Sequence, residues 1–274
     1  KDSLHLRSGV TIRGQGNETI LRKCDGCFSK LVLDGDHGEE QVTLADPLGF
    51  EVGMGISVID DRSRGFHISV ATIVGAEGNI FRLSRPLVGD YIITENARAS
   101  NAVAVISGYY VDNIRIENIL VEGNKTRNHP ITGCLGAGIY LYRGCNVHIQ
   151  NCRVENYTGD GISYQKSDDV VIVDCVVRGN TALGIHPGSG SLRTVVRGCE
   201  VADNGRDGIF ICWRVQQGVF EHNRVENNGS AGISIGHKDT DNLIRGNIIS
   251  NNGRYGILFR EELPVMGAHR NRIE

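Results

Sequence analysis

Apolar and polar residues alternate in short runs through the second half of the chain, and one pattern returns at a nearly constant interval. A Gly-Ile pair opens each repeat, and successive glycines are 23, 23, 24, 24 and 24 residues apart. The six glycines are Gly138, Gly161, Gly184, Gly208, Gly232 and Gly256. A fixed period of this length is typical of a solenoid, in which each repeat stacks only on its neighbours.

Further columns keep the same register. A small or amide residue recurs at Cys152, Cys175, Cys199, Asn223, Asn247 and Asn271, and an apolar residue at Val154, Val177, Val201, Val225, Ile249 and Ile273. A second set of asparagines follows at Asn156, Asn180, Asn204, Asn228 and Asn252. Asn tolerates left-handed backbone, and its amide can bond to the same amide one repeat away. We therefore predict that each column stacks in a line, with the apolar columns inside.

The local pattern indicates which kind of solenoid this is. No repeat contains ten residues with helical periodicity, whereas segments such as GISYQKS and VVIVDCVV read as strands. About 24 residues supply the short strands and turns of one coil of a parallel β-helix, whose coils rise ~4.8 Å each. We predict an all-β chain with an entering coil at 1–35, a β-rich insertion at 36–100 packed on the early coils without a separate fold, and β-helix coils at 101–274.

This pattern resembles the right-handed parallel β-helix (pectate-lyase-like) superfamily, which includes polysaccharide lyases, polygalacturonase-type hydrolases and C5-epimerases. The resemblance covers residues 102–274 and is specific for the fold, because members share coils and differ in chemistry. It implies a carbohydrate-active protein with a polysaccharide substrate and an extracellular or periplasmic location. The chain opens inside a strand region and stops in mid-coil, so we expect a fragment from which any secretory signal is missing.

Composition narrows the range of partners. The net charge is −3, and the basic residues form only a narrow stripe without interleaved aromatic platforms, so nucleic-acid binding is disfavoured. No run of 18 apolar residues exists that could span a membrane. The inward cysteines either stack as small apolar residues or bond to one another. Cys24 and Cys27 form a lone CxxC motif that indicates a local disulfide or buried thiols rather than zinc.

Function should be read from the columns that face outward. Strand alternation places Tyr140, Ser163, His186, Phe210, Ser234 and Leu258 on the outer face. A basic stripe follows along the coil and consists of Arg143, Lys166, Arg214, Lys238 and Arg260, with Ser189 in one coil. Like charges stacked one coil apart repel each other. Either acids interleave with them as a solvated mixed-charge face, or an anionic saccharide binds there.

The densest chemistry lies in the segment Gly236–Asn242 and the coils on either side. We predict His237, Lys238 and Arg260 as catalytic residues, and Trp213, Arg214, His186, Lys166, Arg143, Asp239 and Glu261 as substrate-binding residues. A histidine can act as a base near neutral pH, and a tryptophan face can stack on a sugar ring. Lys238 with Arg260 resembles the Lys/Arg pairing of β-helix lyases, in which cations neutralise a uronate carboxylate. Four nearby acids are candidate ligands of a Ca²⁺ ion, or they could instead form ion pairs with the basic stripe. They are Asp239, Asp241, Glu261 and Glu262.

A second resemblance points to polygalacturonase-type hydrolases. The segment AGISIGHKD is similar to their HGISIG motif and YGILFRE to their later RIK motif, but Ala231 replaces the motif histidine. Asp160 and Asp207 precede signature glycines two coils apart, a separation of about 10 Å that suits an inverting pair. The sequence thus favours proton abstraction on an acidic polysaccharide by a lyase or C5-epimerase. An inverting hydrolase and a non-enzymatic carbohydrate-binding or surface protein, trimeric for instance, are the alternatives.

Overall fold

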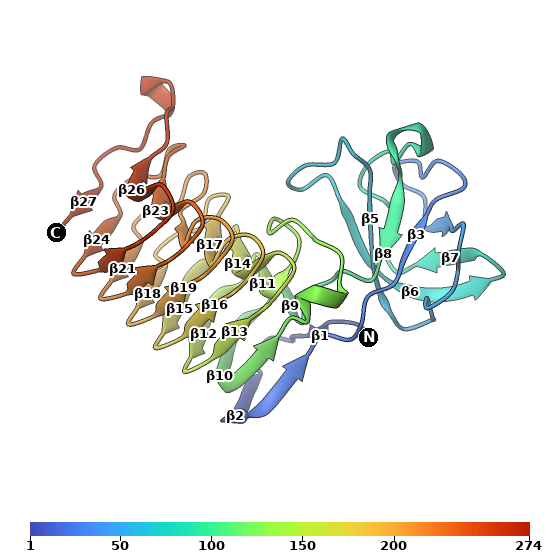
Figure 1. Cartoon of the computed structure of the whole chain (residues 1–274), viewed down its shortest axis with the longest axis horizontal. Helices are drawn as coiled ribbons and strands as arrows, with labels where there is room; N and C mark the ends of the chain where they lie inside the picture. Colours follow the sequence, from blue (N-terminus) through green and yellow to red (C-terminus); the bar gives the residue numbers. More distant parts are fainter.

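Strands make up nearly all of the regular structure. The computed structural model describes residues 1–274, and its only helical segments are the 3-10 turns η1 (Ile93–Glu95), η2 (Lys125–Arg127) and η3 (Pro264–Met266). Successive coils stack from the N-terminal strands to the C-terminus, and a second body stands beside the first coils (Figure 1). The solenoid therefore carries one added unit near its N-terminal end.

One parallel sheet, called sheet A, runs along the solenoid and is formed by the strands that follow the signature glycines. Its strands in spatial order are β1 (Leu4–His5), β9 (Ile106–Tyr109), β11 (Ala137–Tyr142), β14 (Asp160–Gln165), β17 (Ile185–Gly188), β20 (Ile209–Phe210), β23 (Ala231–Ile235) and β26 (Tyr255–Phe259). Every pairing within it is parallel. Sheet A is thus one continuous wall built from one strand of each coil.

The other walls belong to a parallel sheet with two arms that meet at the long strand β10 (Asp112–Glu122). One arm contains β12 (Cys145–Gln150), β15 (Asp168–Val173), β18 (Val195–Arg197), β21 (Val219–Glu221), β24 (Leu243–Arg245) and β27 (Arg272–Ile273). The other contains β13 (Arg153–Glu155), β16 (Val176–Arg178), β19 (Glu200–Ala202), β22 (Arg224–Glu226) and β25 (Ile248–Ser250), and β2 (Thr11–Arg22) pairs with β10 itself. These walls close the chain into a parallel β-helix, which confirms the predicted fold class.

Stacked apolar columns fill the interior. Ile139, Ile162, Ile185, Ile209 and Ile233 have no exposed surface and belong to one hydrophobic cluster that runs through the coils. Cys152, Cys175 and Cys199 are buried, unbridged thiols whose Sγ atoms donate to backbone carbonyls. The predicted inward columns are confirmed as far as Ile249, and the cysteines act as small interior side chains.

Asparagine ladders bind neighbouring coils together on the inside. The Nδ2 of Asn180 donates to the Oδ1 of Asn204 at 2.9 Å, and the same bond repeats from Asn204 to Asn228 and from Asn228 to Asn252. At the start of this ladder the backbone N–H of Tyr157 bonds to Asn180, so Tyr157 and not Asn156 occupies the ladder position. Each internal amide is therefore satisfied by the next coil.

The expected position of Asn271 was wrong by one column. Its Oδ1 accepts from the Nδ2 of Asn242 at 2.9 Å, and Ile273 pairs with Ile244 rather than continuing the column of Ile249. The reason is a longer connection after β26, which carries η3 and lengthens the last repeat to 29 residues. The strict period ends where this loop leaves the solenoid.

The insertion is an antiparallel sheet with its own interior. Its strands in spatial order are β3 (Phe28–Lys30), β8 (Arg98–Ser100), β5 (Gly55–Ile59), β6 (Ser69–Glu77), β7 (Ile80–Leu83) and β4 (Gln41–Thr43). It begins at Phe28, inside the stretch 1–35 that was assigned to the entering coil. Fifteen buried residues form a core distinct from that of the solenoid. The insertion therefore has a hydrophobic core of its own beside that of the solenoid, and its lack of independent folding stays a prediction.

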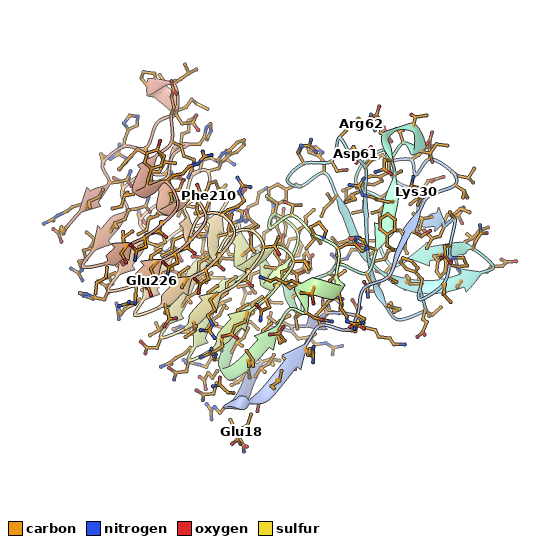
Figure 2. The ribbon with its side chains drawn as sticks, viewed as in Figure 1. Glu18, Lys30, Asp61, Arg62, Phe210 and Glu226 are labelled. Carbon is orange, nitrogen blue, oxygen red and sulfur yellow. The ribbon has the colours of Figure 1, made fainter.

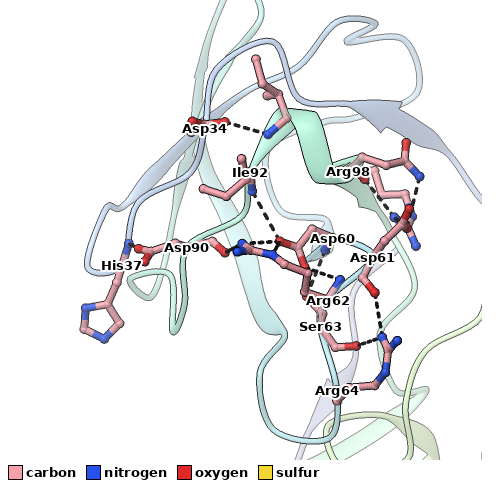
Figure 3. Close-up of polar contacts among 12 residues, drawn as sticks. Asp34, His37, Asp60, Asp61, Arg62, Ser63, Arg64, Asp90, Ile92 and Arg98 are labelled. Carbon is pink, nitrogen blue, oxygen red and sulfur yellow. Dashed lines mark hydrogen bonds and ion pairs between the residues drawn. The ribbon is translucent and has the colours of Figure 1, made fainter.

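Asp60 organises the loop that follows β5 (Figure 3). Its carboxylate accepts from the backbone N–H and guanidinium of Arg62, from the Ser63 hydroxyl, and from the backbone N–H of Ile92. Burial alone would raise the pKa of Asp60, but these hydrogen bonds outweigh it and lower the pKa below its usual value. One buried carboxylate thus joins this loop to the segment that contains Ile92, elsewhere in the insertion.

Ile233→Asp should unfold several coils, because it places an unpaired charge in a column on which both neighbouring repeats depend. We expect a loss of about 4 kcal/mol or more, measured by chemical denaturation. Ile248→Asp is the matched control on β25 of the same coil, where the native side chain is 61% exposed. Equal melting of the two variants would show that the isoleucine column of sheet A is not the interior.

Candidate functional site

The turn that follows sheet A carries a column of chemistry-bearing side chains. Backbone hydrogen bonds connect consecutive turns, for example from Arg143 N–H to the Gln165 carbonyl and from Ser189 N–H to the Cys212 carbonyl. These bonds fix the order of the column, which is Arg143, Lys166, Ser189, Trp213 and His237. We call this set the turn column. Arg214 and Lys238 lie one position further along their turns, so the predicted basic stripe is two adjacent columns.

The turn holds its side chains in an uncommon backbone conformation. Arg143, Lys166 and Trp213 have φ values of 53°, 50° and 55°, and Arg214 and Lys238 have 67° and 55°. Left-handed backbone costs residues other than Gly, Asn and Asp about 1–2 kcal/mol. Bulky cations and a tryptophan thus occupy positions where glycine or asparagine would be less strained. The same conformation recurs at Arg193, Gln217 and His222 in other turns, so it reflects the geometry of the coil.

The cations of these two columns have no acidic partners. No carboxylate lies within ion-pair distance of Arg143, Lys166, Arg214 or Lys238, although nineteen other such pairs form in the molecule, from Lys1–Glu51 to Arg272–Glu274. Interleaved acids are therefore absent from ion-pair range of these four cations, whereas the fifth member of the predicted stripe, Arg260, does pair with Asp239.

Three of these cations share one open groove. Arg143, Lys166 and Arg214 line it, with Ser189 between them. Asp168 borders the same groove, but its carboxylate is paired with Arg193. Arg143 and Lys166 lie near the face of the Tyr142 ring, at 5.8 and 5.9 Å from its centre. The groove therefore offers unneutralised positive charge, with an aromatic ring at one end.

The two aromatic members at the C-terminal end of the turn column stack on each other. The ring centres of Trp213 and His237 are 4.8 Å apart at an interplanar angle of 31°, and Trp213 is 49% exposed. The Nδ1 of His237 lies 3.2 Å from a carboxylate oxygen of Glu262. When the imidazole is neutral, this carboxylate favours a proton on Nδ1 and leaves the Nε2 lone pair free. Glu262, which the sequence suggested as a candidate Ca²⁺ ligand, thus contacts the ring of His237 instead.

Arg260 does not point into the groove. Its guanidinium donates to the Ser234 hydroxyl at 2.8 Å, to the Ile211 carbonyl at 2.7 Å and to the Asp239 carboxylate at 3.2 Å. It also lies over the Phe210 ring, 4.3 Å from its centre. All these partners belong to the solenoid, so the expectation that Arg260 receives a substrate carboxylate does not fit its contacts.

Asp239 is likewise a structural residue. It is fully buried, and its carboxylate accepts the backbone N–H groups of Val215 and Gly236. Burial raises the pKa of Asp239 to about 6, although those hydrogen bonds and Arg260 favour the charged form. Glu261 is exposed and makes no side-chain hydrogen bond or ion pair, so neither predicted acid lies in the groove.

The comparison with protein families gives a match to the right-handed β-helix region over residues 55–191 and 117–262. The chain belongs to the right-handed β-helix family. No curated protein sequence matches it.

Solved structures similar to this β-helix include enzymes and phage tailspikes. The periplasmic alginate epimerase AlgG is 19% identical, with 58% of this chain and 36% of that chain covered and a TM-score of 0.48. Dettilon tailspike protein gp208 is 17% identical, with 62% and 38% covered and a TM-score of 0.47. The A-module of Azotobacter vinelandii mannuronan C-5 epimerase AlgE6 is 14% identical, with 55% of each chain covered and a TM-score of 0.30. The chain thus spans about a third of the length of AlgG, and at these identities the likeness concerns the fold.

The outer face of sheet A in this β-helix holds a second histidine–carboxylate pair. His186 is 4% exposed, and its Nδ1 lies 2.7 Å from the Asp160 carboxylate. Its Nε2 is buried without a partner, and the Phe210 ring meets it edge to face at 5.4 Å. Figure 2 shows Phe210 on this side of the coils and Glu226 on the opposite side. His186 thus lies on β17 just before Ser189 of the turn column, and almost none of its surface is exposed.

The two aspartates of the predicted inverting pair have the same backbone role. One carboxylate oxygen of Asp160 accepts the backbone N–H of Leu183, and one of Asp207 accepts that of Ala231. Each aspartate thus caps the next coil, and Asp160 is further bound to His186. These contacts explain both Asp-Gly pairs as parts of the coil.

The acids considered for Ca²⁺ point to separate partners in the β-helix. Asp239 contacts Arg260, Asp241 forms a two-bond pair with Arg270, and Glu262 contacts His237. No group of three or more His, Cys, Asp or Glu side chains is arranged to hold a metal ion. None of the helical turns is long and apolar enough to cross a membrane.

Glu262→Ala should change the preferred tautomer of His237, because the carboxylate that favours the Nδ1 proton is removed. The measurement is the ¹⁵N chemical shift of the neutral imidazole in protein labelled at histidine. We expect a shift toward the Nε2-protonated form, and no change at His222, an exposed histidine on another turn. An unaltered His237 tautomer would show that Glu262 does not orient this ring.

Proposed function

We propose that this β-helix acts on an acidic, uronate-containing polysaccharide by abstracting the C5 proton, as a lyase or a C5-epimerase. The observation that carries the proposal is the row of unpaired cations Arg143, Lys166 and Arg214 along an open groove, with the unpaired Lys238 one coil beyond Arg214. A coil rises ~4.8 Å, which is close to the length of one sugar residue. A polymer with repeated carboxylates therefore matches the row in charge, and it matches the spacing of Arg143 and Lys166 on successive coils. An extracellular or periplasmic location fits such a substrate.

His237 is the base in this proposal. Glu262 holds the ring through Nδ1, so Nε2 can accept the C5 proton. The cations of the groove neutralise the adjacent carboxylate, which stabilises the negative charge that develops when C5 loses its proton. Trp213 stacks on His237 and offers its remaining exposed surface to a sugar ring.

The fate of the electron pair separates the two reactions. In a lyase the pair forms a C4=C5 double bond and the oxygen at C4 leaves with a proton. In an epimerase C5 takes a proton back on the opposite face. Lys238 follows His237 directly, is exposed and has no acidic partner, so it is the candidate proton donor for either outcome.

The hydrolase alternative has less support from the geometry. Asp160 and Asp207 are engaged in backbone caps, and Asp160 is paired with a buried histidine. A binding protein without catalysis remains compatible with the same cation row. Activity on a polyuronate therefore separates the proposal from both alternatives.

The test is an activity screen on polyuronates in D₂O, with a neutral polysaccharide as the control substrate. A lyase gives the ultraviolet absorbance of the C4=C5 bond, and an epimerase incorporates deuterium at C5, which NMR detects. His237→Ala should lower kcat by about 10²–10⁴-fold, the usual contribution of a positioned base. Release of reducing ends without unsaturation or exchange would indicate hydrolysis and contradict the proposal, as would binding without turnover.

Lys166→Ala should raise KM about tenfold with a smaller effect on kcat, as expected for the loss of one charge-assisted contact. Arg193→Ala is the matched control, because Arg193 is a cation beside the same groove whose guanidinium is bound by Asp169 at 2.8 Å. Equal effects of the two substitutions would mean that the unpaired row has no special role in binding substrate.

A further inference from the structure

A separate small cavity lies where three parts of the chain meet. The N-terminal segment supplies Asp2 and His5, the insertion supplies Thr72 and Arg85, and sheet A supplies Ser107. The cavity has a volume of about 220 Å³. In Figure 1 the N-terminus and β1 lie between the solenoid and the insertion. The pocket is thus distinct from the groove of the turn column, and the site proposed above uses none of its residues.

Three side chains in this cavity form a hydrogen-bonded relay. The Oγ of Ser107 lies 2.9 Å from the Nδ1 of His5, and the Nε2 of His5 lies 3.0 Å from a carboxylate oxygen of Asp2. A carboxylate only accepts, so Nε2 must carry the proton in this contact. In the neutral ring Nδ1 is then a lone pair, and the Ser107 hydroxyl donates to it. The relay is therefore oriented so that His5 can take the serine proton.

The neighbouring structure holds the relay in place. The Thr72 hydroxyl donates to the same Asp2 oxygen at 2.8 Å, and the Ser3 backbone N–H donates to the other oxygen at 2.8 Å. Ser107 is buried on β9, and His5 is its only side-chain hydrogen-bond partner. Other outward serines of sheet A have structural partners instead, since Ser163 donates to the Gly133 carbonyl and Ser234 accepts from Arg260. Among these serines, Ser107 alone contacts a base.

Arg85 provides the positive charge of the cavity. No carboxylate lies within ion-pair distance of it, and its guanidinium lies over the Tyr109 ring at 4.5 Å from the centre. A guanidinium has five N–H donors that suit an oxygen on which negative charge develops. The cavity therefore contains a nucleophile, a base with its orienting acid, and a candidate group for stabilising an oxyanion.

We propose that Ser107, His5 and Asp2 hydrolyse a short-chain carboxylic ester in this cavity, an activity beyond the proposed action on polyuronates. The Ser107 oxygen attacks the ester carbonyl while its proton passes to His5. The tetrahedral intermediate collapses, and the alcohol leaves with that proton, so Ser107 becomes acylated. Water then attacks the acyl group and gives a proton to His5, and as the C–O bond to Ser107 breaks His5 returns that proton to the serine oxygen, which releases the carboxylic acid and restores Ser107 and neutral His5. Asp2 acts as a positioning residue through the His5 ring.

The size of the cavity selects the acyl group. Pockets for drug-sized ligands usually measure about 300–1,000 Å³, and this cavity lies below that range. An acetyl group fits such a space, whereas a long acyl chain does not. We therefore expect p-nitrophenyl acetate to be a substrate and the corresponding octanoate ester to be a poor one.

The test combines a fluorophosphonate probe, which reacts with activated serines, with hydrolysis of p-nitrophenyl acetate by the 274-residue chain. Mass spectrometry should find the probe on Ser107. Ser107→Ala should abolish labelling at this position, and His5→Gln should lower hydrolysis by about 10²-fold or more. His5 has a 51% exposed side chain, so this variant should keep its fold even if Ser107→Ala does not. Asp2→Asn should lower kcat with KM and thermal melting unchanged, which a purely structural role would not produce.

Ser163→Ala is the matched control. Ser107 and Ser163 both pair with Tyr140 on the strand between them. Ser163 therefore occupies the same outward position as Ser107, two coils further along sheet A. Labelling and hydrolysis should survive this change. The proposal is overturned if the parent protein is not labelled at Ser107, or if hydrolysis is unchanged in His5→Gln. Neither result depends on polyuronates, so this test and the test of the proposed function can fail independently.

Discussion

The in-register stacking of one coil on the next is the constraint on which the rest of the molecule depends. Parallel backbone hydrogen bonds set a rise of ~4.8 Å between equivalent positions, so any residue type that recurs at the repeat becomes a column. Buried isoleucines and the Asn180–Asn252 ladder make this register costly to change, because a slip would bury polar groups and break amide bonds. The interior thereby fixes where every turn residue lies.

The turn column follows from that constraint. Coil stacking holds Arg143 and Lys166 at neighbouring positions and places Trp213 against His237, although the backbone at several of these residues is left-handed. Like charges at this spacing do not stabilise the solenoid, and no acid neutralises them. The interior supplies the stability that this repulsion and strain oppose. An anionic polymer that lies along the groove would relieve the repulsion.

The fold could be predicted from the sequence because its signal repeats six times. Glycines, isoleucines and asparagines at a fixed period leave few other architectures, and the structure agrees with them except at Asn156, where Tyr157 takes the ladder position, and at Asn271, where a loop lengthens the last repeat. The insertion was harder to predict because it has no period. Its first strand at Phe28 and its separate core depend on antiparallel pairings between distant segments.

The candidate site was only partly predictable, for a physical reason. Residue type and spacing indicated Trp213, His237 and the cations, but a side chain with several donors can turn inward as well as outward. Arg260 turns back onto the outer face of sheet A, where it binds Ser234, the Ile211 carbonyl and Asp239, and spacing does not reveal this. The relay of Asp2, His5 and Ser107 was missed entirely. It joins residues more than 100 positions apart, and only the pairing of β1 with β9 brings them together.

The most direct test is a crystal structure of the protein with a bound oligouronate. If the unpaired cation row is the substrate site, the sugar chain lies along the turn column, and its carboxylates are within ion-pair distance of Arg143, Lys166 or Arg214. One ring then lies beside Trp213 with C5 facing the Nε2 of His237. An oligosaccharide that binds without contacting these cations, for example over His186 and Asp160, would contradict this interpretation.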